Sequence, residues 1–139
     1  MLDIAKDALT VAAKEIGGYP VVCYVTSPEF VRAAIDVVAA RFGGLDILMS
    51  NAGGAFQGKL TDVEDDTFRK AFELNFWGHH YMARECVRVM KKQSSGGAIV
   101  FNVSKQAVNP GPDFGPSKAA PSWRRCASTP SSTDPTASP

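Results

Sequence analysis

Three polar side chains at the ends or bends of apolar segments are the candidates for chemistry in this sequence. Asn51 begins an Asn-Ala-Gly-Gly turn after one apolar run, Asn75 lies beside the apolar stripe of a long helical pattern, and Ser104 ends a second apolar run. A buried amide is retained when it is hydrogen-bonded, and a serine hydroxyl is a very weak acid unless a base lies beside it. These residue types therefore favour holding another group in place over moving a proton unaided.

The segment that follows Ser104 offers no better proton-transfer group. Residues 101–121 read "FNVSKQAVNPGPDFGPSKAAP", with an amine at Lys118 and no tyrosine. The last tyrosine of the chain is Tyr81, which lies in the long helical pattern. Phe114, the aromatic residue before the lysine, has no ionisable proton. The segment thus supplies a hydroxyl and an amine, but no phenol.

The spacing of histidines and cysteines predicts no metal or redox centre. His79 and His80 are adjacent, so on a helix their side chains point about 100° apart and cannot bind one metal ion together. We interpret both histidines as surface or interface residues. The cysteines form no metal-binding or redox spacing and are interpreted as reduced thiols of a cytosolic protein: Cys23, Cys86 and Cys126.

Length and charge exclude several other classes of protein. The chain has 139 residues, enough for one domain, with 15 basic and 14 acidic side chains. No cluster of Lys and Arg interleaved with aromatic residues is present, which argues against a nucleic-acid partner. No apolar run approaches membrane-spanning length, and the acidic, helical start lacks the basic and apolar blocks of a signal peptide. We therefore expect a cytoplasmic protein without membrane association.

The periodicity of apolar residues predicts alternating helices and strands. Helices are expected at 3–16, 28–42 and 62–92, and short apolar strands at 20–26, 45–50 and 98–104. Ser27 and Pro28 are typical of a helix start, and the spacing of Thr61 and Glu64 predicts a capping box before the third helix. Apolar strands separated by helices predict an α/β fold with a parallel sheet and flanking helices.

Composition changes sharply toward the end of the chain. Residues 1–116 carry the periodic pattern, whereas 117–139 read "SKAAPSWRRCASTPSSTDPTASP", rich in Ser, Pro and Thr. A segment of this composition cannot bury enough apolar surface to offset its chain entropy. We predict one domain over 1–116, followed by a disordered tail over 117–139.

Three segments resemble, in chain order, the short-chain dehydrogenase/reductase family. "LDILMSNAGG" resembles that family's fourth strand and Asn-Ala-Gly turn, "FELNFWG" the segment with its asparagine, and "GGAIVFNVS" the fifth strand ending at its serine. "FNVSKQAVNPG" is closer still to the dehydrogenase half of bifunctional aldolase/short-chain dehydrogenases. The resemblance covers roughly residues 1–120, and it implies a partial Rossmann-like fold that uses NAD or NADP.

The resemblance also implies catalytic roles. In the family a tyrosine transfers the proton and a lysine lowers the pKa of that tyrosine, while the serine holds the substrate oxygen and the asparagine orders a water relay. Counting the family spacing forward from Ser104 gives Ser117, and counting back from Lys118 gives Phe114. Neither register supplies a tyrosine, so Asn75, Ser104 and Lys118 are expected to be vestiges of a catalytic site.

The cofactor residues implied by the resemblance are incomplete. Asn51, Ala52 and Gly53 match the turn that contacts NAD or NADP, and Asp3 corresponds to the acidic residue that binds the ribose hydroxyls. The family's glycine-rich loop, which holds the pyrophosphate on backbone N–H groups, matches no part of this sequence. In the family the first strands lie in the middle of the sheet, so the partial fold is expected to lack that centre.

Two functional hypotheses follow. In the first, the chain is a fragment of an NAD(P)-dependent oxidoreductase of small alcohols or hydroxyaldehydes, inactive as it stands because the tyrosine and the glycine-rich loop are missing. In the second, it is a non-catalytic module that forms a homodimer through helix 62–92, which is apolar on much of its circumference and pairs with its twin in the family. An unrelated α/β binding domain would have to place Asn51, Asn75 and Ser104 by coincidence.

Overall fold

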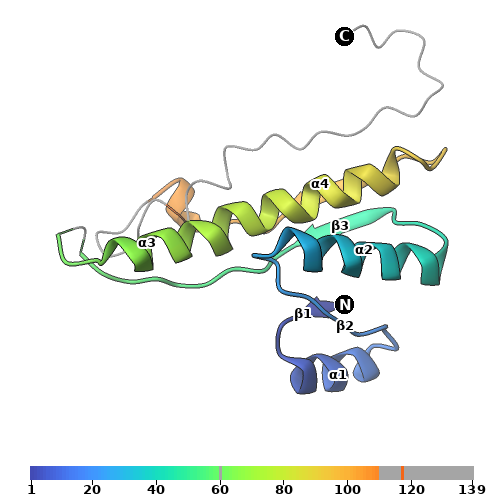
Figure 1. Ribbon diagram of the computed structural model, residues 1–139, viewed down its shortest axis with the longest axis horizontal. Coiled ribbons are helices and arrows are strands. Elements are labelled where there is room, and N and C mark those ends of the chain that lie inside the picture. Colours follow the sequence, from blue (N-terminus) through green and yellow to red (C-terminus); the bar gives the residue numbers. More distant parts are fainter. Residues whose placement is uncertain (60, 110–116, 118–139) are drawn as a thin grey trace, which may run out of the picture.

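The computed structural model describes residues 1–59, 61–109 and 117, and its elements form two small sheets flanked by helices (Figure 1). The elements in chain order are β1 (Leu2–Asp3), α1 (Lys6–Glu15), β2 (Val21–Val22), α2 (Pro28–Phe42), β3 (Ile47–Ser50), α3 (Asp65–Phe72), a π-helical turn (Glu73–Trp77), α4 (Gly78–Met90), β4 (Ala98–Phe101) and a 3-10 helix (Lys105–Ala107). α3, the π-helical turn and α4 run together as one long helix across the molecule (Figure 1).

Each sheet contains two parallel strands. β1 pairs with β2 so that Leu2 lies beside Val21, and β3 pairs with β4 from Ile47 beside Ala98 onward. Parallel strands need a long crossover connection, which α1 supplies in the first sheet and the long helix supplies in the second. The predicted α/β fold with parallel strands and flanking helices is confirmed.

The start of the chain differs from the predicted helix over 3–16. Leu2 and Asp3 form β1, and α1 begins only at Lys6. The strand is defined by its bonds to the next strand, such as that from Cys23 N to Asp3 O at 3.0 Å. A two-residue strand has no periodicity of its own, so only its distant partner reveals it.

α2 begins and ends where the sequence predicts. Ser27 Oγ accepts a hydrogen bond from Phe30 N at 3.4 Å, and Pro28 occupies the first helical position. Gly43 ends the helix at φ 81°, a left-handed conformation that residues with a side chain rarely adopt. Sequence signals at both ends of this helix are local, which is why they were sufficient.

The long helix predicted over 62–92 is a composite. α3 begins at Asp65, residues Glu73–Trp77 form the π-helical turn, and α4 ends at Met90. Single π-helical turns inside α-helices occur often at functional sites. This one has Asn75 at its centre.

The capping box predicted before this helix does not form. The Thr61 hydroxyl donates to Asp62 Oδ1 at 2.8 Å, and the N-cap residue is Glu64, without a side-chain cap. The helix therefore starts several residues later than the capping box requires. The N–H of Val63, one of the donors that a Thr61 cap would use, bonds instead to Lys59 O at 3.1 Å.

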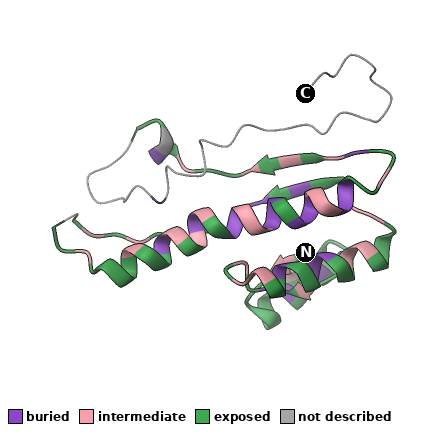
Figure 2. Ribbon diagram, turned by 45° about the horizontal axis from the view of Figure 1, so that its top comes forward, coloured by how far each residue is buried: buried purple, intermediate pink, exposed green. Residues whose placement is uncertain are grey.

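One hydrophobic core connects both sheets. Its buried members come from the end of β2, from α2, from β3 and from α4, and they include Cys23, Val31, Ile35, Leu48, Met82, Cys86 and Met90. Figure 2 shows these buried positions as bands on the inward sides of α2 and α4. Because strand pairing joins β1 only to β2 and β3 only to β4 among the described residues, the helices carry the connection between the two sheets.

A group of ion pairs links α4 to α2 beside this core. Glu85, 4% exposed, accepts hydrogen bonds from Arg88 Nε at 2.7 Å and from Arg84 Nε at 3.1 Å, and Arg88 also donates to Asp36. Burial alone would raise the pKa of the Glu85 carboxyl, but the hydrogen bonds from Arg88 and Arg84 outweigh it and hold that pKa below its ordinary value. The carboxylate therefore stays charged and orients both arginines.

Large apolar side chains remain exposed on one face of the β3–β4 sheet. Burial alternates along β3, where Leu48 is buried while Ile47 and Met49 are 68% and 64% exposed. Val100 of β4 pairs beside Met49 and is 44% exposed. In the described ranges of the chain, this face of the sheet is left largely open to solvent.

The predicted tail over 117–139 lies outside the described residues except for Ser117, which is 3% exposed. The boundary predicted at residue 116 falls in the same undescribed region. Of the helices in the described ranges, none is long and apolar enough to cross a membrane.

The contact between α2 and α4 can be tested with two substitutions in α2. We expect Ile35→Ala to lower the free energy of unfolding by about 2–5 kcal/mol, because Ile35 is 1% exposed and its truncation leaves a cavity. Val37→Ala, at a position that is 44% exposed, should change it by no more than about 0.5 kcal/mol. Urea unfolding followed by circular dichroism measures both values, and equal effects would contradict the described core.

Candidate functional site

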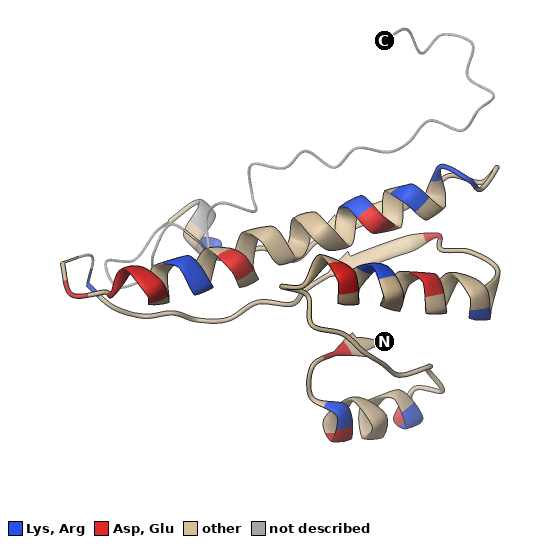
Figure 3. Cartoon of the chain, viewed as in Figure 1, with Lys and Arg blue, Asp and Glu red and all other residues tan. Residues whose placement is uncertain are grey.

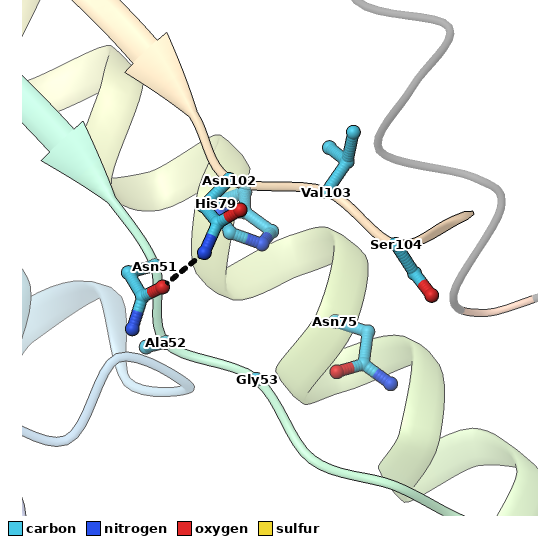
Figure 4. A pocket seen from close by; sticks show the side chains of 8 residues that line it. All are labelled: Asn51, Ala52, Gly53, Asn75, His79, Asn102, Val103 and Ser104. Atoms are coloured by element: carbon cyan, nitrogen blue, oxygen red, sulfur yellow. Dashed lines mark hydrogen bonds between the residues drawn. The ribbon is translucent and has the colours of Figure 1, made fainter. Parts of the chain in front are cut away.

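A pocket of about 280 Å³ lies at the carboxyl ends of β3 and β4, against the π-helical turn and the start of α4 (Figure 4). The residues that line it are Asn51, Ala52, Gly53, Asn75, His79, Asn102, Val103 and Ser104. The polar side chains among them are carboxamides, a hydroxyl and an imidazole. Sites beyond the carboxyl ends of parallel strands are where α/β folds bind ligands, and this lining suits uncharged groups that form hydrogen bonds.

The structure brings most of the predicted site residues together. Five of them line the pocket: Asn51, Ala52, Gly53, Asn75 and Ser104. Asp3 instead ends β1 in the other sheet, where its Oδ1 accepts a hydrogen bond from Ala5 N at 2.9 Å. Lys118 lies outside the described residues. The predicted residues near the ends of β3 and β4 therefore lie around one pocket, and Asp3 does not.

The two strand ends are connected across the pocket. Asn102 Nδ2 donates to Asn51 Oδ1 at 2.5 Å, and Asn102 N donates to Ser50 O at 2.9 Å (Figure 4). Asn51 and Asn102 each follow the last residue of a strand, so the parallel register places them side by side. Asn102 was not predicted as a site residue, although its position after a strand parallel to β3 gives the signal.

Asn75 fixes the turn that follows β3. Its side chain is 2% exposed, its Oδ1 accepts from Gly54 N at 2.9 Å, and its Nδ2 donates to Gly54 O at 3.1 Å. A Cβ at Gly54 would lie 3.1 Å from Leu74 and 3.2 Å from Phe56, so the close approach favours glycine. The predicted buried, hydrogen-bonded amide is thus observed, and its partner is the main chain of the turn.

The same amide reaches a second segment. Asn75 Nδ2 also donates to Ser117 Oγ at 3.3 Å, and Ser117 is 3% exposed. Ser117 stands where the spacing from Ser104 would place the proton-transferring phenol. A serine hydroxyl is a far weaker acid than a phenol.

Ser104 keeps a hydrogen-bond donor available. Its Oγ accepts from Gln106 N at 3.3 Å at the start of the 3-10 helix. A hydroxyl that accepts through a lone pair can still donate its proton to another oxygen. Figure 4 shows the Ser104 hydroxyl and the Asn75 amide on the same side of the pocket. Ser104 can therefore hold a carbonyl or alcohol oxygen.

His79 is a pocket residue that the sequence reasoning missed. We expected a surface or interface residue, but His79 is 5% exposed and its Nδ1 lies 2.6 Å from Ser50 Oγ, within hydrogen-bond distance. His79 follows Asn75 by one helical turn, so both side chains face the same way. The four-residue spacing between Asn75 and His79 is the sequence signal for this position.

The cysteines of the described ranges are not reactive groups. Burial raises the pKa of the Cys86 thiol to about 12, with a further contribution from the charge of Glu85, and burial also raises the pKa of Cys23. Both are free and buried in the core, so neither forms a thiolate at neutral pH. No group of three or more His, Cys, Asp or Glu side chains in the described ranges could hold a metal ion.

Comparison with known proteins matches the sequence and the fold of this chain to one family. A sequence model of the family described as enoyl-(acyl carrier protein) reductase matches residues 2–122. The short chain aldehyde dehydrogenase 1 of Euphorbia lathyris is 37% identical over 107 residues, which are 71% of this chain and 37% of that protein. The 11-beta-hydroxysteroid dehydrogenase A of Sesamum indicum is 36% identical over 115 residues, or 78% of this chain and 32% of that protein.

Solved structures give the same result. A short-chain type dehydrogenase/reductase from Mycobacterium marinum is 32% identical with a TM-score of 0.78, covering 86% of this chain and 52% of that one. The 3-ketoacyl-(acyl-carrier-protein) reductase of Brucella melitensis, solved with NADH, is 26% identical with a TM-score of 0.79, covering 88% and 52%. This chain thus spans about a third to a half of the relatives it matches. It belongs to the short-chain dehydrogenase/reductase family.

Proposed function

We propose that this chain carries the serine and asparagine side of an NAD(P)-dependent oxidoreductase site for small alcohols or hydroxyaldehydes, and that it does not turn over by itself. The observation that carries the proposal is the convergence of Asn75, Ser104 and the turn from Asn51 on one pocket. Members of the family are NAD(P)-dependent oxidoreductases. The closer resemblance to the dehydrogenase half of bifunctional aldolase/short-chain dehydrogenases supports the hydroxyaldehyde part of the proposal.

The residues present fit one end of the cofactor better than the other. The pocket supplies amides, a hydroxyl and the exposed backbone of Ala52 and Gly53, which suit the uncharged nicotinamide end and its ribose. The pyrophosphate needs several converging N–H groups at the start of a helix, and no glycine-rich loop of that pattern occurs in the sequence. When bound in full, the cofactor would exchange a hydride with the substrate carbon.

The chain's own residues would act by holding and orienting. Ser104 would donate a hydrogen bond to the substrate oxygen, because its own oxygen accepts from Gln106 N and its hydroxyl hydrogen is left to donate. Asn75 would keep the turn in place through Gly54, so that the turn presents its backbone to the pocket. A group that moves the proton would still be needed, because hydride and proton transfer must occur on the same bound substrate.

We expect the purified chain to show no saturable binding of NAD or NADP and no turnover. Isothermal titration calorimetry measures the binding, and NADH absorbance with a panel of small hydroxyaldehydes and polyols measures the turnover. Binding should fail because no glycine-rich loop supplies N–H groups to the pyrophosphate, and turnover should fail because no tyrosine is present after Ser104 to transfer the proton. Micromolar affinity for either dinucleotide, or measurable turnover, would contradict the proposal.

Adding the missing parts separates the two causes of inactivity. A version extended upstream by a strand, a glycine-rich turn, a helix and a second strand should bind the dinucleotide without turning over. The substitutions Ser117→Tyr and Pro121→Lys in the unextended chain should restore neither property. Only both changes, with helix-forming sequence in place of 122–139, should give alcohol oxidation in the absorbance assay.

The role proposed for Asn75 can be tested without a cofactor. Asn75→Ala should lower the free energy of unfolding by about 1–3 kcal/mol, because it leaves both main-chain groups of Gly54 without their partner. Asn102→Ala, at an exposed site, should cost less than about 1 kcal/mol. Hydrogen exchange at the Gly54 amide should accelerate in the first variant and not in the second. Unchanged exchange in Asn75→Ala would show that the turn does not depend on this side chain.

The long helix favours a second candidate function, a non-catalytic homodimer module. Residues 74–83 carry no Lys, Arg, Asp or Glu, and Figure 3 shows this uncharged stretch in the middle of the helix. Trp77 is 40% exposed there and stacks on Tyr81, whose ring also lies under Arg84 at 5.5 Å. Exposed aromatic residues beside an arginine are enriched in protein interfaces.

The homodimer alternative is tested by measuring the oligomeric state of the chain in solution. If the chain pairs through the long helix, light scattering after size-exclusion chromatography should give a dimer mass, and Trp77→Glu should give a monomer. Val37→Glu, at another exposed apolar position, should leave the mass unchanged. A monomer for the parent chain, or a monomer produced by Met49→Lys instead of Trp77→Glu, would contradict a dimer through this helix.

A further inference from the structure

Ser50 and His79 form a buried polar pair in which His79 lines the pocket, and the function proposed above gives neither residue a role. Ser50 is the last residue of β3 and is 4% exposed, while His79 is in the first turn of α4 and is 5% exposed. Ser50 Oγ and His79 Nδ1 are 2.6 Å apart, the distance of a short hydrogen bond. If either side chain is truncated, the other loses its hydrogen-bond partner while it stays buried, and this lowers the stability of the fold.

The imidazole ring contacts two strand ends at once. Besides Ser50, it lies edge-on to Phe101, the last residue of β4, with ring centroids 5.8 Å apart and planes at 81°. Ser50 immediately precedes Asn51, and Phe101 immediately precedes Asn102. The ring therefore touches the residue before each of the two asparagines that meet across the pocket.

These two asparagines depend on the distance between the strand ends. Asn102 Nδ2 reaches Asn51 Oδ1 at 2.5 Å, so the two strand ends must lie close enough for these short side chains to meet. Figure 4 shows Asn51, Asn102 and His79 entering the pocket from the ends of β3 and β4 and from α4. The main chain joins these strand ends by the bond from Asn102 N to Ser50 O, and His79 of α4 contacts the last residue of each strand.

We propose that His79 is a positioning residue: through Ser50 and Phe101 it sets the spacing of the two strand ends, so that Asn51 and Asn102 meet and the turn from Asn51 is held ready for a ligand. The inference rests on the proposed function only for the nature of that ligand. The geometry itself can be tested on the chain without any ligand.

Side-chain amide signals in the NMR spectrum of the isotope-labelled full chain report this geometry. The side-chain amide signals of Asn51 and Asn102 report the contact between the two strand ends at the pocket. Those of Gln93 provide a matched control at the opposite end of the same sheet, because Gln93 Oε1 accepts from Leu45 N at 2.6 Å and its Nε2 donates to Leu45 O at 3.1 Å. All three amides belong to one spectrum of one sample.

Three variants separate the contacts of the ring. His79→Phe keeps a ring against Phe101 and removes the nitrogen that pairs with Ser50, whereas Ser50→Ala removes the hydroxyl and keeps the imidazole. We expect both to shift the amide signals of Asn51 and Asn102 and to leave those of Gln93 in place. His79→Asn, which keeps a polar atom near the position of Nδ1, should return the shifted signals part of the way toward those of the parent chain.

Unmoved Asn51 and Asn102 signals in folded Ser50→Ala would overturn the inference. Equal changes at Gln93 would overturn it too, since a role in overall stability alone affects both ends of the sheet. If His79→Phe does not fold, the Asn51 and Asn102 signals of Ser50→Ala alone test the inference. This variant replaces a hydroxyl by hydrogen and adds no bulk. The measurements contain no nucleotide, so their result is independent of whether the chain binds NAD or NADP.

Discussion

The packing of α2 against α4 holds this molecule together, because strand pairing does not join its two sheets in the described part of the chain. Cys23 beside β2 and Leu48 in β3 belong to one buried cluster through helix residues, among them Ile35 and Cys86. Protein interiors are packed as densely as organic crystals. The position of one sheet relative to the other therefore follows from how the side chains of these two helices fit, and the ion pairs of Arg88 add a second link between them.

The same constraint reaches the pocket along the long helix. Its carboxyl-terminal half packs on α2, while its middle carries Asn75 and His79, so the core determines where these two side chains meet the strand ends. Asn75 then holds the turn at Gly54, and His79 meets Ser50. The pocket is held in shape by polar contacts between the long helix and the end of β3 with the turn after it. Its shape can therefore persist in a chain that lacks the phenol.

The fold was predictable where its signals are local. Ser27 and Gly43 mark the ends of α2, and the short apolar runs mark β2, β3 and β4 and their parallel arrangement. β1 could not be predicted, because Leu2 and Asp3 form a strand only through their pairing with Val21 and Val22. The predicted capping box does not form because the N–H of Val63, which a Thr61 cap would use, bonds to Lys59 O.

The site was predictable where a family pattern exists and not where this chain differs from it. Asn51, Asn75 and Ser104 were found by resemblance, and the structure places them around one pocket. His79 and Asn102 carry no such pattern. The place of His79 follows from the helical spacing after Asn75, whereas the place of Asn102 follows from the register between β3 and β4, which only the tertiary arrangement shows.

The exposed face of the β3–β4 sheet has a consequence for the handling of the chain. Ile47, Met49 and Val100 present apolar surface on a sheet of only two strands. Sheets with exposed apolar strands and open edges are templates for pairing with other chains, and natural proteins usually protect them with charges, prolines or a covering element. β3 has none of these within Ile47–Ser50. Aggregation therefore competes with folding for this chain, and the outcome of that competition shifts with protein concentration.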